Sequence, residues 1–202
     1  STLDTIDEGA SETYDLSVGG VAAVGTITDD DNAPTVSSVC AASAVEATSL
    51  VHTVTLSNAS ATATTFSLSL TDGTATGGGV DYTSTLTNAA FSNGVTVSAG
   101  VITVPAGVSL FTIRLPTSSS THAAPIQTYT LAAGAASGTG TINDDDAAPT
   151  ISSVSAATQI EGTTLVHTVT LSNASSGVTT FAYTLGGGSA TGGGTDYTTP
   201  PT

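Results

Sequence analysis

An ungapped internal repeat is the feature that most constrains the fold of this sequence. Moving the chain along itself by 115 positions places Asp29 on Asp144. The phrase GTITDDDNAPTVSSV at residues 25–39 returns as GTINDDDAAPTISSV at residues 140–154. A fixed long period is typical of tandem domains, because each repeat then folds as one packed unit. The sequence therefore predicts an array of domains with about 115 residues per repeat.

The same alignment divides the 202 residues into one complete repeat and two partial ones. Residues 34–148 make the complete repeat. Residues 1–33 correspond to the end of a preceding repeat, and residues 149–202 to the beginning of a following one. Neither partial repeat contains a counterpart of residues 88–115. We therefore expect the chain to begin and end inside repeats of a longer array.

Short alternating stretches in the complete repeat predict strands. Apolar side chains recur at every second position, and the breaks between stretches carry TDG, TGGG, SNG and PAG. The positions expected to face inward are Leu50, His52, Val54, Leu56, Phe66, Leu68, Leu70, Phe111, Ile113 and Leu115, with Arg114 facing outward. About seven or eight short strands in roughly 110 residues favour an immunoglobulin-like Greek-key sandwich. We predict an all-β protein of tandem sandwiches.

Charge excludes several classes of function. Sixteen acidic residues stand against one basic residue, a formal net charge of −15, and such a field repels nucleic acid and anionic lipid.

No apolar run reaches the ~18 residues of a membrane span, so we expect no membrane insertion. The single cysteine, Cys40, permits no internal disulfide. No grouping of nucleophile, acid and base is marked by spacing, so we expect no enzymatic activity.

Carboxylates recur where predicted strands begin or end. Glu46 precedes the first long strand, Asp81 follows a glycine-rich turn, and Asp144, Asp145 and Asp146 follow the last strand. In a sandwich these positions can lie at one pole. Oxygen ligands with surplus negative charge suit Ca²⁺, whereas Mg²⁺ requires stricter geometry and Zn²⁺ prefers His or Cys. The pattern predicts Ca²⁺ binding.

Electrostatics bears on the alternative, in which the triplets are only solvated turns before Pro34 and Pro149. Two carboxylates ~4 Å apart repel by about 4 kcal/mol at an effective dielectric constant of 20. Several of them at one pole would destabilise a small domain without a cation. The recurrence of each triplet with a matched Glu and Asp favours the cation.

Longer motifs carry a resemblance to a known family. The segments GTINDDDAAPTISSVSAATQIEGTTLVHTVTLSNAS, ATGGGTDYT, VITVPAGVSLFTIRLPT and TIDEGASETYDLSVGGVAAVGTITDDD span most of the chain. They resemble the extender repeats of large secreted RTX adhesins of Gram-negative bacteria, and they are similar to the Calx-β domain, a calcium-binding sandwich. The resemblance implies an extracellular stalk at the bacterial cell surface, exported by type I secretion.

Taken position by position, the resemblance implies calcium ligands in every part of the chain. They are Glu46, Asp81, Asp144, Asp145 and Asp146 in the complete repeat, Glu161 and Asp196 in the last part, and Asp4, Asp7, Glu8, Asp29, Asp30 and Asp31 in the first. The complete repeat departs from this pattern, because Ser119, His122 and Ala123 stand where the first part has Asp4, Asp7 and Glu8. Fewer ions are therefore expected there, at the junction with the next repeat.

Several conspicuous residues are expected to be structural. His52 and His167 lie on an apolar strand face, where a hydrogen-bonded core histidine is more common than a ligand. The TGGG runs at 76–79 and 191–194 lack the context of a phosphate loop and are expected to be turns with positive φ. We expect Tyr129 to close the sandwich by a hydrogen bond to backbone, and Cys40 to be half-buried.

These features together favour a calcium-rigidified stalk module that holds an adhesive tip away from the cell. Its expected partners are neighbouring repeats of the same chain. Pairing of one molecule's tail with another's head is an alternative use of the open strand edges of the two partial repeats. Two other functions stay open: a calcium-sensing Calx-β-type regulatory domain, and a carbohydrate-binding sandwich, which the 4% aromatic content disfavours.

Overall fold

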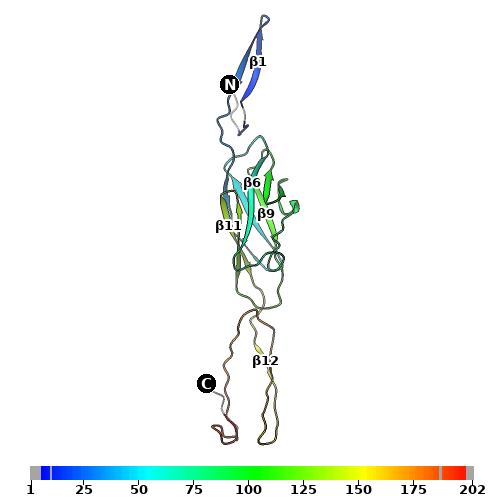
Figure 1. The fold of residues 1–202 in the computed structure, drawn as a ribbon, viewed down its shortest axis with the longest axis vertical. Coiled ribbons are helices and arrows are strands. Elements are labelled where there is room, and N and C mark those ends of the chain that lie inside the picture. Colours follow the sequence, from blue (N-terminus) through cyan, green and yellow to red (C-terminus); the bar gives the residue numbers. More distant parts are fainter. Residues whose placement is uncertain (1–5, 10, 187, 199–202) are drawn as a thin grey trace. The chain divides into compact units, whose positions relative to one another are not determined.

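The computed structural model describes residues 6–9, 11–186 and 188–198. It divides into two compact units, Ser1–Ala147 and Ala148–Thr202, which we describe separately (Figure 1). The one helical element in the described part of the chain is a 3-10 helix of three residues, η1 (Asn88–Ala90). The predicted all-β class is confirmed. Within these described ranges, no helix has the length and apolar character to cross a membrane.

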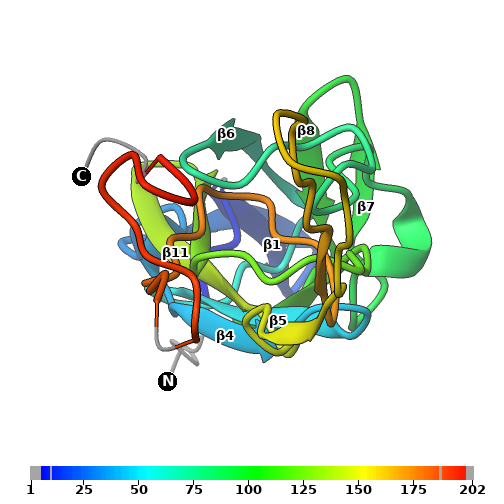
Figure 2. The same cartoon turned by 90° about the horizontal axis from the view of Figure 1, so that it is seen from below.

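Nine strands of the first unit form a two-sheet sandwich, which Figure 2 views along the long axis of Figure 1. The larger sheet has the order β4-β11-β10-β6-β8-β7 and the smaller one the order β3-β5-β9. Their bounds are β3 Val36–Val39, β4 Ala42–Val45, β5 Ser49–Leu56, β6 Thr64–Asp72, β7 Thr96–Ser98, β8 Val101–Val104, β9 Leu110–Pro116, β10 Gln127–Ala133 and β11 Ala136–Asn143.

The alternation of inward and outward side chains along β5 and β9 determines which of them form the core. On β5, His52 and Val54 are fully buried while Val51 between its buried neighbours is half exposed. On β9, Ile113 is fully buried and Arg114 is exposed. Burying one such aliphatic or aromatic side chain contributes about 1.5–3 kcal/mol. The predicted inward faces of β5 and β9 are therefore confirmed, whereas the inward residues of β6 are only half-buried.

The first strand of the sandwich changes sheets, which the sequence did not indicate. β3 pairs antiparallel with β5 in the smaller sheet, and three residues later β4 pairs parallel with β11 in the larger one. Gly138 permits the crossing, because a Cβ there would lie 2.7 Å from the carbonyl oxygen of Val39 and 2.8 Å from that of Cys40. Cys40 lies at this crossing and is exposed, so the prediction of a half-buried cysteine was wrong.

A chain of polar contacts crosses the core. The Nδ1 of His52 lies 2.8 Å from the Cys40 carbonyl oxygen, and its Nε2 lies 2.9 Å from the Tyr129 hydroxyl. Burial lowers the pKa of His52. The neutral ring therefore donates from Nδ1–H to the carbonyl and accepts from the Tyr129 hydroxyl at Nε2. His52 is structural, as predicted.

The hydrogen-bond partner of Tyr129 differs from the one that the sequence predicted. Its hydroxyl reaches a side chain, His52, and not the backbone. Its ring stacks on Tyr82 with centroids 4.4 Å apart, and Tyr82 in turn donates to Asp72 Oδ1 at 2.6 Å. The ring also covers Gly140 on the neighbouring strand, where a Cβ would overlap it. The predicted backbone hydrogen bond was wrong because the tyrosine points across the sandwich.

Two hairpins make up the other strands. In the first unit, β1 (Glu12–Val18) pairs with β2 (Val21–Ile27). In the second unit, β12 (Ile151–Val154) pairs with β13 (Val169–Leu171). Both pairs are antiparallel.

The pairing of both hairpins repeats that of the sandwich. Glu12 is paired with Ile27 in β1–β2, and Gln127 with Ile142 in β10–β11, 115 positions later in each strand. The β12–β13 register, including its irregularity, equals that of β3–β5 with the same shift. The sequence similarity thus extends to strand register.

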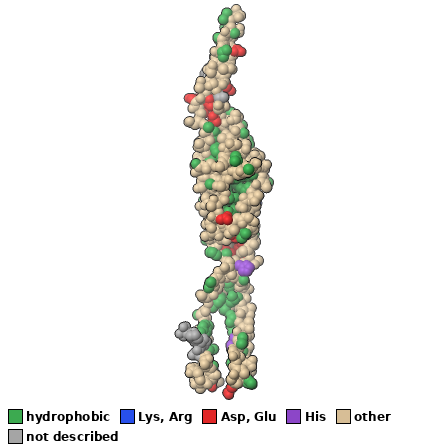
Figure 3. Space-filling view, in the orientation of Figure 1, with side chains coloured by type: hydrophobic (Ala, Val, Ile, Leu, Met, Phe, Trp, Pro, Cys, Tyr) green, Lys and Arg blue, Asp and Glu red, His purple; other side chains and the backbone are tan. Residues whose placement is uncertain are grey.

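Both hairpins expose side chains whose counterparts form the core of the sandwich. Leu16 is 56% exposed, whereas its counterpart Leu131 is fully buried. Val169 is 53% exposed, whereas its counterpart Val54 is fully buried. Hydrophobic side chains are accordingly visible on the surface of both hairpins in Figure 3. Each hairpin has the apolar face of a sandwich sheet without the opposing sheet.

We predict that Tyr129→Phe lowers the free energy of unfolding by about 1–3 kcal/mol, because Nε2 of His52 loses its buried hydrogen-bond donor. Tyr14→Phe is the matched control, since Tyr14 is the counterpart on β1 and is 57% exposed. It should change stability by less than about 0.5 kcal/mol. Urea unfolding monitored by circular dichroism measures both. Equal stabilities of the two variants would contradict the role assigned to this hydrogen bond.

Candidate metal centre

A parallel strand pair places two acidic residues side by side. β4 ends at Val45 opposite Asn143, the last residue of β11. The strands run in the same direction, so the residues that follow them, Glu46 and Asp144, leave the sheet at the same end. The backbone N–H of Glu46 continues the ladder by donating to the Asn143 carbonyl at 3.0 Å. The position of Glu46 is therefore set by the sheet itself.

Three carboxylates converge at this end of the sandwich. Glu46, Asp144 and Asp146 each place an oxygen within 4.8 Å of the others. Glu46 is only 8% exposed, and the two aspartates are half-buried. At that separation each pair of unit charges repels by roughly 1 kcal/mol in water and about 3 kcal/mol at an effective dielectric constant of 20. A divalent cation would replace this repulsion by attraction.

The loop after β9 closes over the carboxylates and contributes hydrogen bonds. The Ser120 N–H donates to Glu46 Oε2 at 2.6 Å, and the Ala124 N–H donates to Asp144 Oδ2 at 2.8 Å. The Ser120 hydroxyl lies 3.4 Å from both Glu46 Oε1 and Asp146 Oδ2. Sequence reasoning missed Ser120, since a serine in TSSSTHAAP carries no signal of proximity to Glu46.

The local environment shifts the pKa values of Glu46 and Asp144 in opposite directions. Burial, together with the charges of Asp144 and Asp146, raises the pKa of Glu46 above its ordinary value of 4.5. The Ala124 N–H lowers the pKa of Asp144 below its ordinary value of 3.8. Of the two groups, Glu46 is therefore the one whose charged form is disfavoured.

Asp81 and Asp145 do not belong to this group of three. Asp81 Oδ2 accepts the Thr76 N–H at 2.7 Å, which ties its carboxylate to the glycine-rich turn. In that turn Gly78 and Gly79 have φ of 73° and 87°, so the predicted positive-φ turn is confirmed. Asp145 is exposed. That either residue is a ligand stays a prediction.

The first hairpin repeats the backbone contacts of the cluster. Asp29 Oδ2 accepts the N–H of Gly9 at 2.9 Å, and its Oδ1 accepts the N–H of Asp31 at 3.2 Å. These residues are the counterparts of Asp144, Ala124 and Asp146. The Gly9 N–H lowers the pKa of Asp29 below 3.8. The two aspartates therefore occupy the same hydrogen-bonded position in successive repeats.

The remaining predicted ligands are distributed as follows. Asp7 is 7% exposed and its side chain contacts Asp29. Glu8 lies in the same loop, with its N–H 3.2 Å from Asp29 Oδ2, and Asp30 is exposed. In the second unit Glu161 is exposed, and Asp196 Oδ2 accepts the Thr191 N–H at 2.7 Å, as Asp81 does with Thr76. Asp4 lies outside the described residues.

The donor set is compatible with a hard divalent cation. Carboxylate and hydroxyl oxygens surround the cluster, which are the ligands of Ca²⁺ and Mg²⁺. The residues come from three separate segments, which can adapt to the larger and more variable coordination sphere of Ca²⁺. The geometry thus fits an oxygen-coordinated ion held between the β4 end, the β11 end and the loop after β9.

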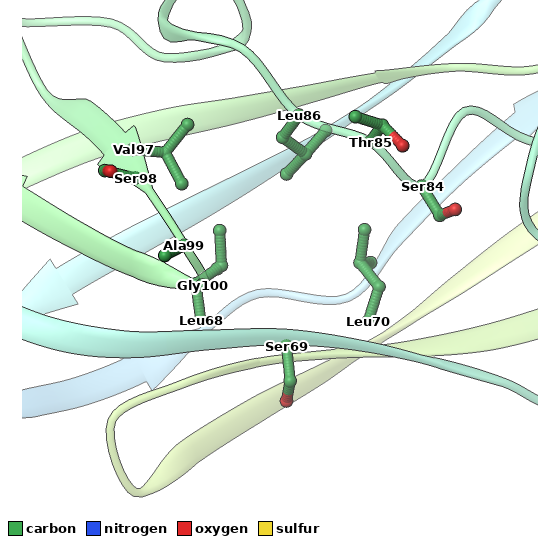
Figure 4. A pocket seen from close by; sticks show the side chains of 10 residues that line it. All are labelled: Leu68, Ser69, Leu70, Ser84, Thr85, Leu86, Val97, Ser98, Ala99 and Gly100. Atoms are coloured by element: carbon green, nitrogen blue, oxygen red, sulfur yellow. The ribbon is translucent and has the colours of Figure 1, made fainter.

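A pocket of about 310 Å³ opens elsewhere on the sandwich, beside β6. In Figure 4 the aliphatic side chains of Leu68, Leu70, Leu86 and Val97 converge on this space, and Ser69 points away from it. Its lining consists of aliphatic, serine, threonine and glycine residues without a charged group. Leu68 and Leu70, two of the half-buried inward side chains of β6, line this pocket, and none of the lining residues belongs to the three-carboxylate cluster.

The acidic cluster and the β-sandwich agree with a comparison to known families. Residues 29–123 match the Calx-beta domain. The match covers just under half of the chain; it includes Glu46 and Asp81 and ends before Asp144. The Calx-beta match supports a calcium-related β-sandwich domain.

Solved structures similar to this chain include the following two. The crystal structure of CBD12 from CALX1.2 has a TM-score of 0.42 and 16% sequence identity, and the alignment covers 57% of this chain and 47% of that one. The I9–I11 tandem from titin has a TM-score of 0.25 and 13% identity, covering 74% and 45%. The chain thus spans about half the length of these structures. No curated protein matches the sequence.

We predict a pH-dependent gain of stability for Glu46→Gln in chelator. The ion-free folded protein binds a proton at Glu46 more tightly than the unfolded chain does, so the charged group costs stability at pH 7.5. The variant should therefore unfold at a higher temperature than the parent at pH 7.5. The advantage should shrink as the pH falls and vanish below about 4.5, where Glu46 is protonated in both states.

Asp145→Asn is the matched control, because it removes a neighbouring charge that lies outside the three-carboxylate group. Its effect in chelator should be smaller at pH 7.5. Thermal unfolding of the three proteins between pH 4 and 8 measures the difference. A Glu46→Gln protein that is less stable than the parent in chelator at pH 7.5 would refute the electrostatic assignment.

Proposed function

We propose that this chain is part of a calcium-rigidified extender of a secreted bacterial surface adhesin, a stalk that projects an adhesive tip from the cell. The observation that carries the proposal is the location of the three-carboxylate cluster. Asp144 and Asp146 follow β11 directly, and the boundary between the two units falls between Ala147 and Ala148. An ion bound by these side chains would therefore be held by residues that directly precede, in sequence, the boundary between the two units.

Calcium suits this site better than other common ions. The cluster offers oxygen ligands, and Ca²⁺ accepts six to eight oxygens at ~2.3–2.6 Å in flexible geometries. Zn²⁺ would favour His or Cys. The three-carboxylate group contains neither, and Cys40 is exposed at the crossing between β3 and β4. The Calx-beta match over residues 29–123 also supports calcium.

The proposed mechanism is electrostatic cross-linking. Without a cation, the charged forms of Glu46, Asp144 and Asp146 repel one another, which disfavours the position of the segment after β11 beside Glu46. Glu46, Asp144 and Asp146 would hold a divalent cation, whose charge would offset their repulsion and would favour the segment after β11 staying at the end of the sheet. A flexible joint then becomes a stiff one at the calcium concentrations found outside cells.

The partners of this module are neighbouring repeats. The hairpins β1–β2 and β12–β13 have the registers of sandwich strands and expose the faces that are buried in residues 36–143. Preceding and following repeats of a longer array would complete both. Head-to-tail pairing between two molecules is a second way to cover those faces, although such a composite would lack counterparts of β7, β8 and β9.

A calcium-sensing regulatory domain is the second candidate, and the Calx-beta match is the observation that favours it. The two functions differ in affinity. An extracellular structural module works with dissociation constants of ~10⁻⁴ to 10⁻³ M, whereas a sensor works at ~10⁻⁷ to 10⁻⁵ M. Calorimetric titration with Ca²⁺ separates them.

We predict that millimolar Ca²⁺ raises the melting temperature of the first unit relative to chelator, because the ion binds the folded cluster and not the dispersed chain. Mg²⁺ at the same concentration should have a smaller effect. Differential scanning calorimetry measures both shifts. Identical melting temperatures in Ca²⁺ and chelator would eliminate the calcium proposal.

We also predict that replacing Asp144, Asp145 and Asp146 together by Ala abolishes the calcium-dependent stiffness between units while each sandwich strand remains in place. The core does not depend on these side chains, so the far-ultraviolet circular dichroism spectrum should be unchanged. Small-angle scattering in Ca²⁺ should show a less extended particle than the parent. Asp15→Ala, an exposed acidic residue on β1, is the control and should scatter like the parent. A triple variant as extended as the parent would contradict the proposal.

A further inference from the structure

We propose that the loop between β5 and β6 is a socket that receives the acidic loop of the preceding repeat and couples cation binding to the stiffness of the joint. The socket consists of residues 57–61, with the sequence Ser-Asn-Ala-Ser-Ala. The inserted loop consists of residues 6–9 of the first hairpin. This inference rests on the proposed function and names the surface through which it would act.

Main-chain contacts define the socket. The carbonyl oxygen of Asp7 accepts the Ala61 N–H at 2.7 Å and the Ser60 hydroxyl at 3.1 Å. Asp7 and Ser60 form a parallel β-bridge. Asp7 is 7% exposed and Ser60 is 4% exposed, although both are polar and both lie outside the named strands. Burial of two polar loop residues against each other indicates a specific contact.

The asparagine of the socket holds the linker that joins hairpin and sandwich. Asn58 Nδ2 donates to the Asn32 carbonyl at 2.8 Å, and its Oδ1 accepts the Ser57 hydroxyl at 2.6 Å. Ser57 Oγ also accepts the N–H of Thr35 at 3.0 Å. One side chain thus orients the amide of Asn58, and that amide fixes the linker just before the sandwich begins.

The socket is itself fastened to the sandwich. The Ser60 carbonyl accepts the N–H of Gly107, in the turn between β8 and β9, at 2.8 Å. Ser60 Oγ also accepts the Thr62 N–H at 3.2 Å. The contacts at Asp7 are therefore transmitted to a rigid part of the fold and not to a free loop.

The inserted loop is connected to the aspartate triplet of its own repeat. Asp29 Oδ2 accepts the N–H groups of Glu8 and Gly9, which directly follow Asp7. Figure 3 shows acidic side chains gathered near the segment that leads from the hairpin into the sandwich. A cation that orders Asp29 and its neighbours therefore also orders the Asp7 carbonyl. By linkage, a closed socket must increase the affinity of that cation by the same factor.

The socket is suited to recur along an array, because it recognises the backbone. The Asp7 contacts use its carbonyl oxygen, so the side chain at that position can vary, and the counterpart 115 residues later is His122. The receiving sequence is retained, since Ser-Asn-Ala-Ser stands at 57–60 and again at 172–175. A contact of this kind requires that the serine and asparagine of the socket recur, whereas the side chain at the position of Asp7 can differ. The two repeats show this pattern.

The same residues have the form of a glycosylation acceptor, Asn-x-Ser. In the structure Asn58 Nδ2, the atom that would carry the glycan, donates to the Asn32 carbonyl. The Ser60 hydroxyl is likewise engaged and buried. The hydrogen bonds that Asn58 and Ser60 make at the joint therefore give these two residues a structural role that needs no glycan.

The test is a distance measurement across the joint in the full chain. Cys40 is replaced by Ser, the residue at its counterpart Ser155, and spin labels are attached at Val21→Cys and Val101→Cys, both exposed positions. Electron–electron resonance in Ca²⁺ should give a narrow distance distribution for this protein and a broad one in chelator. Adding Asn58→Ala and Ser60→Ala should remove the narrow distribution in Ca²⁺.

Two controls separate this inference from the proposed function. Asn173→Ala with Ser175→Ala alters the second copy of the motif and should leave the measured distribution narrow. Calorimetry of the Asn58→Ala/Ser60→Ala protein should still show a Ca²⁺-dependent rise in melting temperature, because Glu46, Asp144 and Asp146 are unchanged. A narrow distribution in that variant would overturn the socket, and an equally narrow distribution of the unaltered joint in chelator would overturn its coupling to the cation. Loss of the melting shift in the unaltered protein would instead refute the calcium proposal.

Discussion

The parallel pairing of β4 with β11 is the constraint on which the three-carboxylate cluster depends. An antiparallel neighbour of β11 would have begun, and not ended, beside Asn143. Because the two strands run together, Glu46 and Asp144 leave the sheet at the same point, and Asp146 reaches them two residues later. The pairing itself requires the first strand to change sheets after Val39, a crossing that only a glycine at position 138 leaves room for.

Electrostatic repulsion at this end is tolerated because the core lies elsewhere. The sandwich is stabilised by the alternating apolar faces of β5 and β9 and by the buried contact of His52 with Tyr129. None of these contacts involves the acidic cluster. The fold can therefore keep three neighbouring carboxylates in an unfavourable arrangement whose free energy improves when a cation binds. Under the proposed function, separation of the stable core from the charged end would let that end respond to ions without unfolding the domain.

The two acidic loops of the first unit share the same backbone hydrogen bonds. Asp29 and Asp144 accept hydrogen bonds from equivalent backbone N–H groups, although the loops that donate them differ in charge. The first loop carries Asp7 and Glu8, whereas the second carries His122 and Ala123. The backbone arrangement is thus independent of the number of acidic side chains. The number of acidic side chains can therefore differ between the two loops while these backbone hydrogen bonds are retained.

The sequence alone determined the repeat period, the all-β class, the inward faces of β5 and β9 and the acidic residues to consider, because periodicity and charge are local properties. It did not determine which carboxylates meet. Glu46, Asp144 and Asp146 converge through a parallel pair and a loop, whereas Asp81 is held by the turn at Thr76. It also misplaced Cys40 and the hydroxyl of Tyr129, and it gave no signal for Ser120. The meeting of Glu46 with Asp144, the Tyr129 hydrogen bond and the position of Ser120 depend on contacts between residues 70 or more positions apart, and only the tertiary structure brings such residues together.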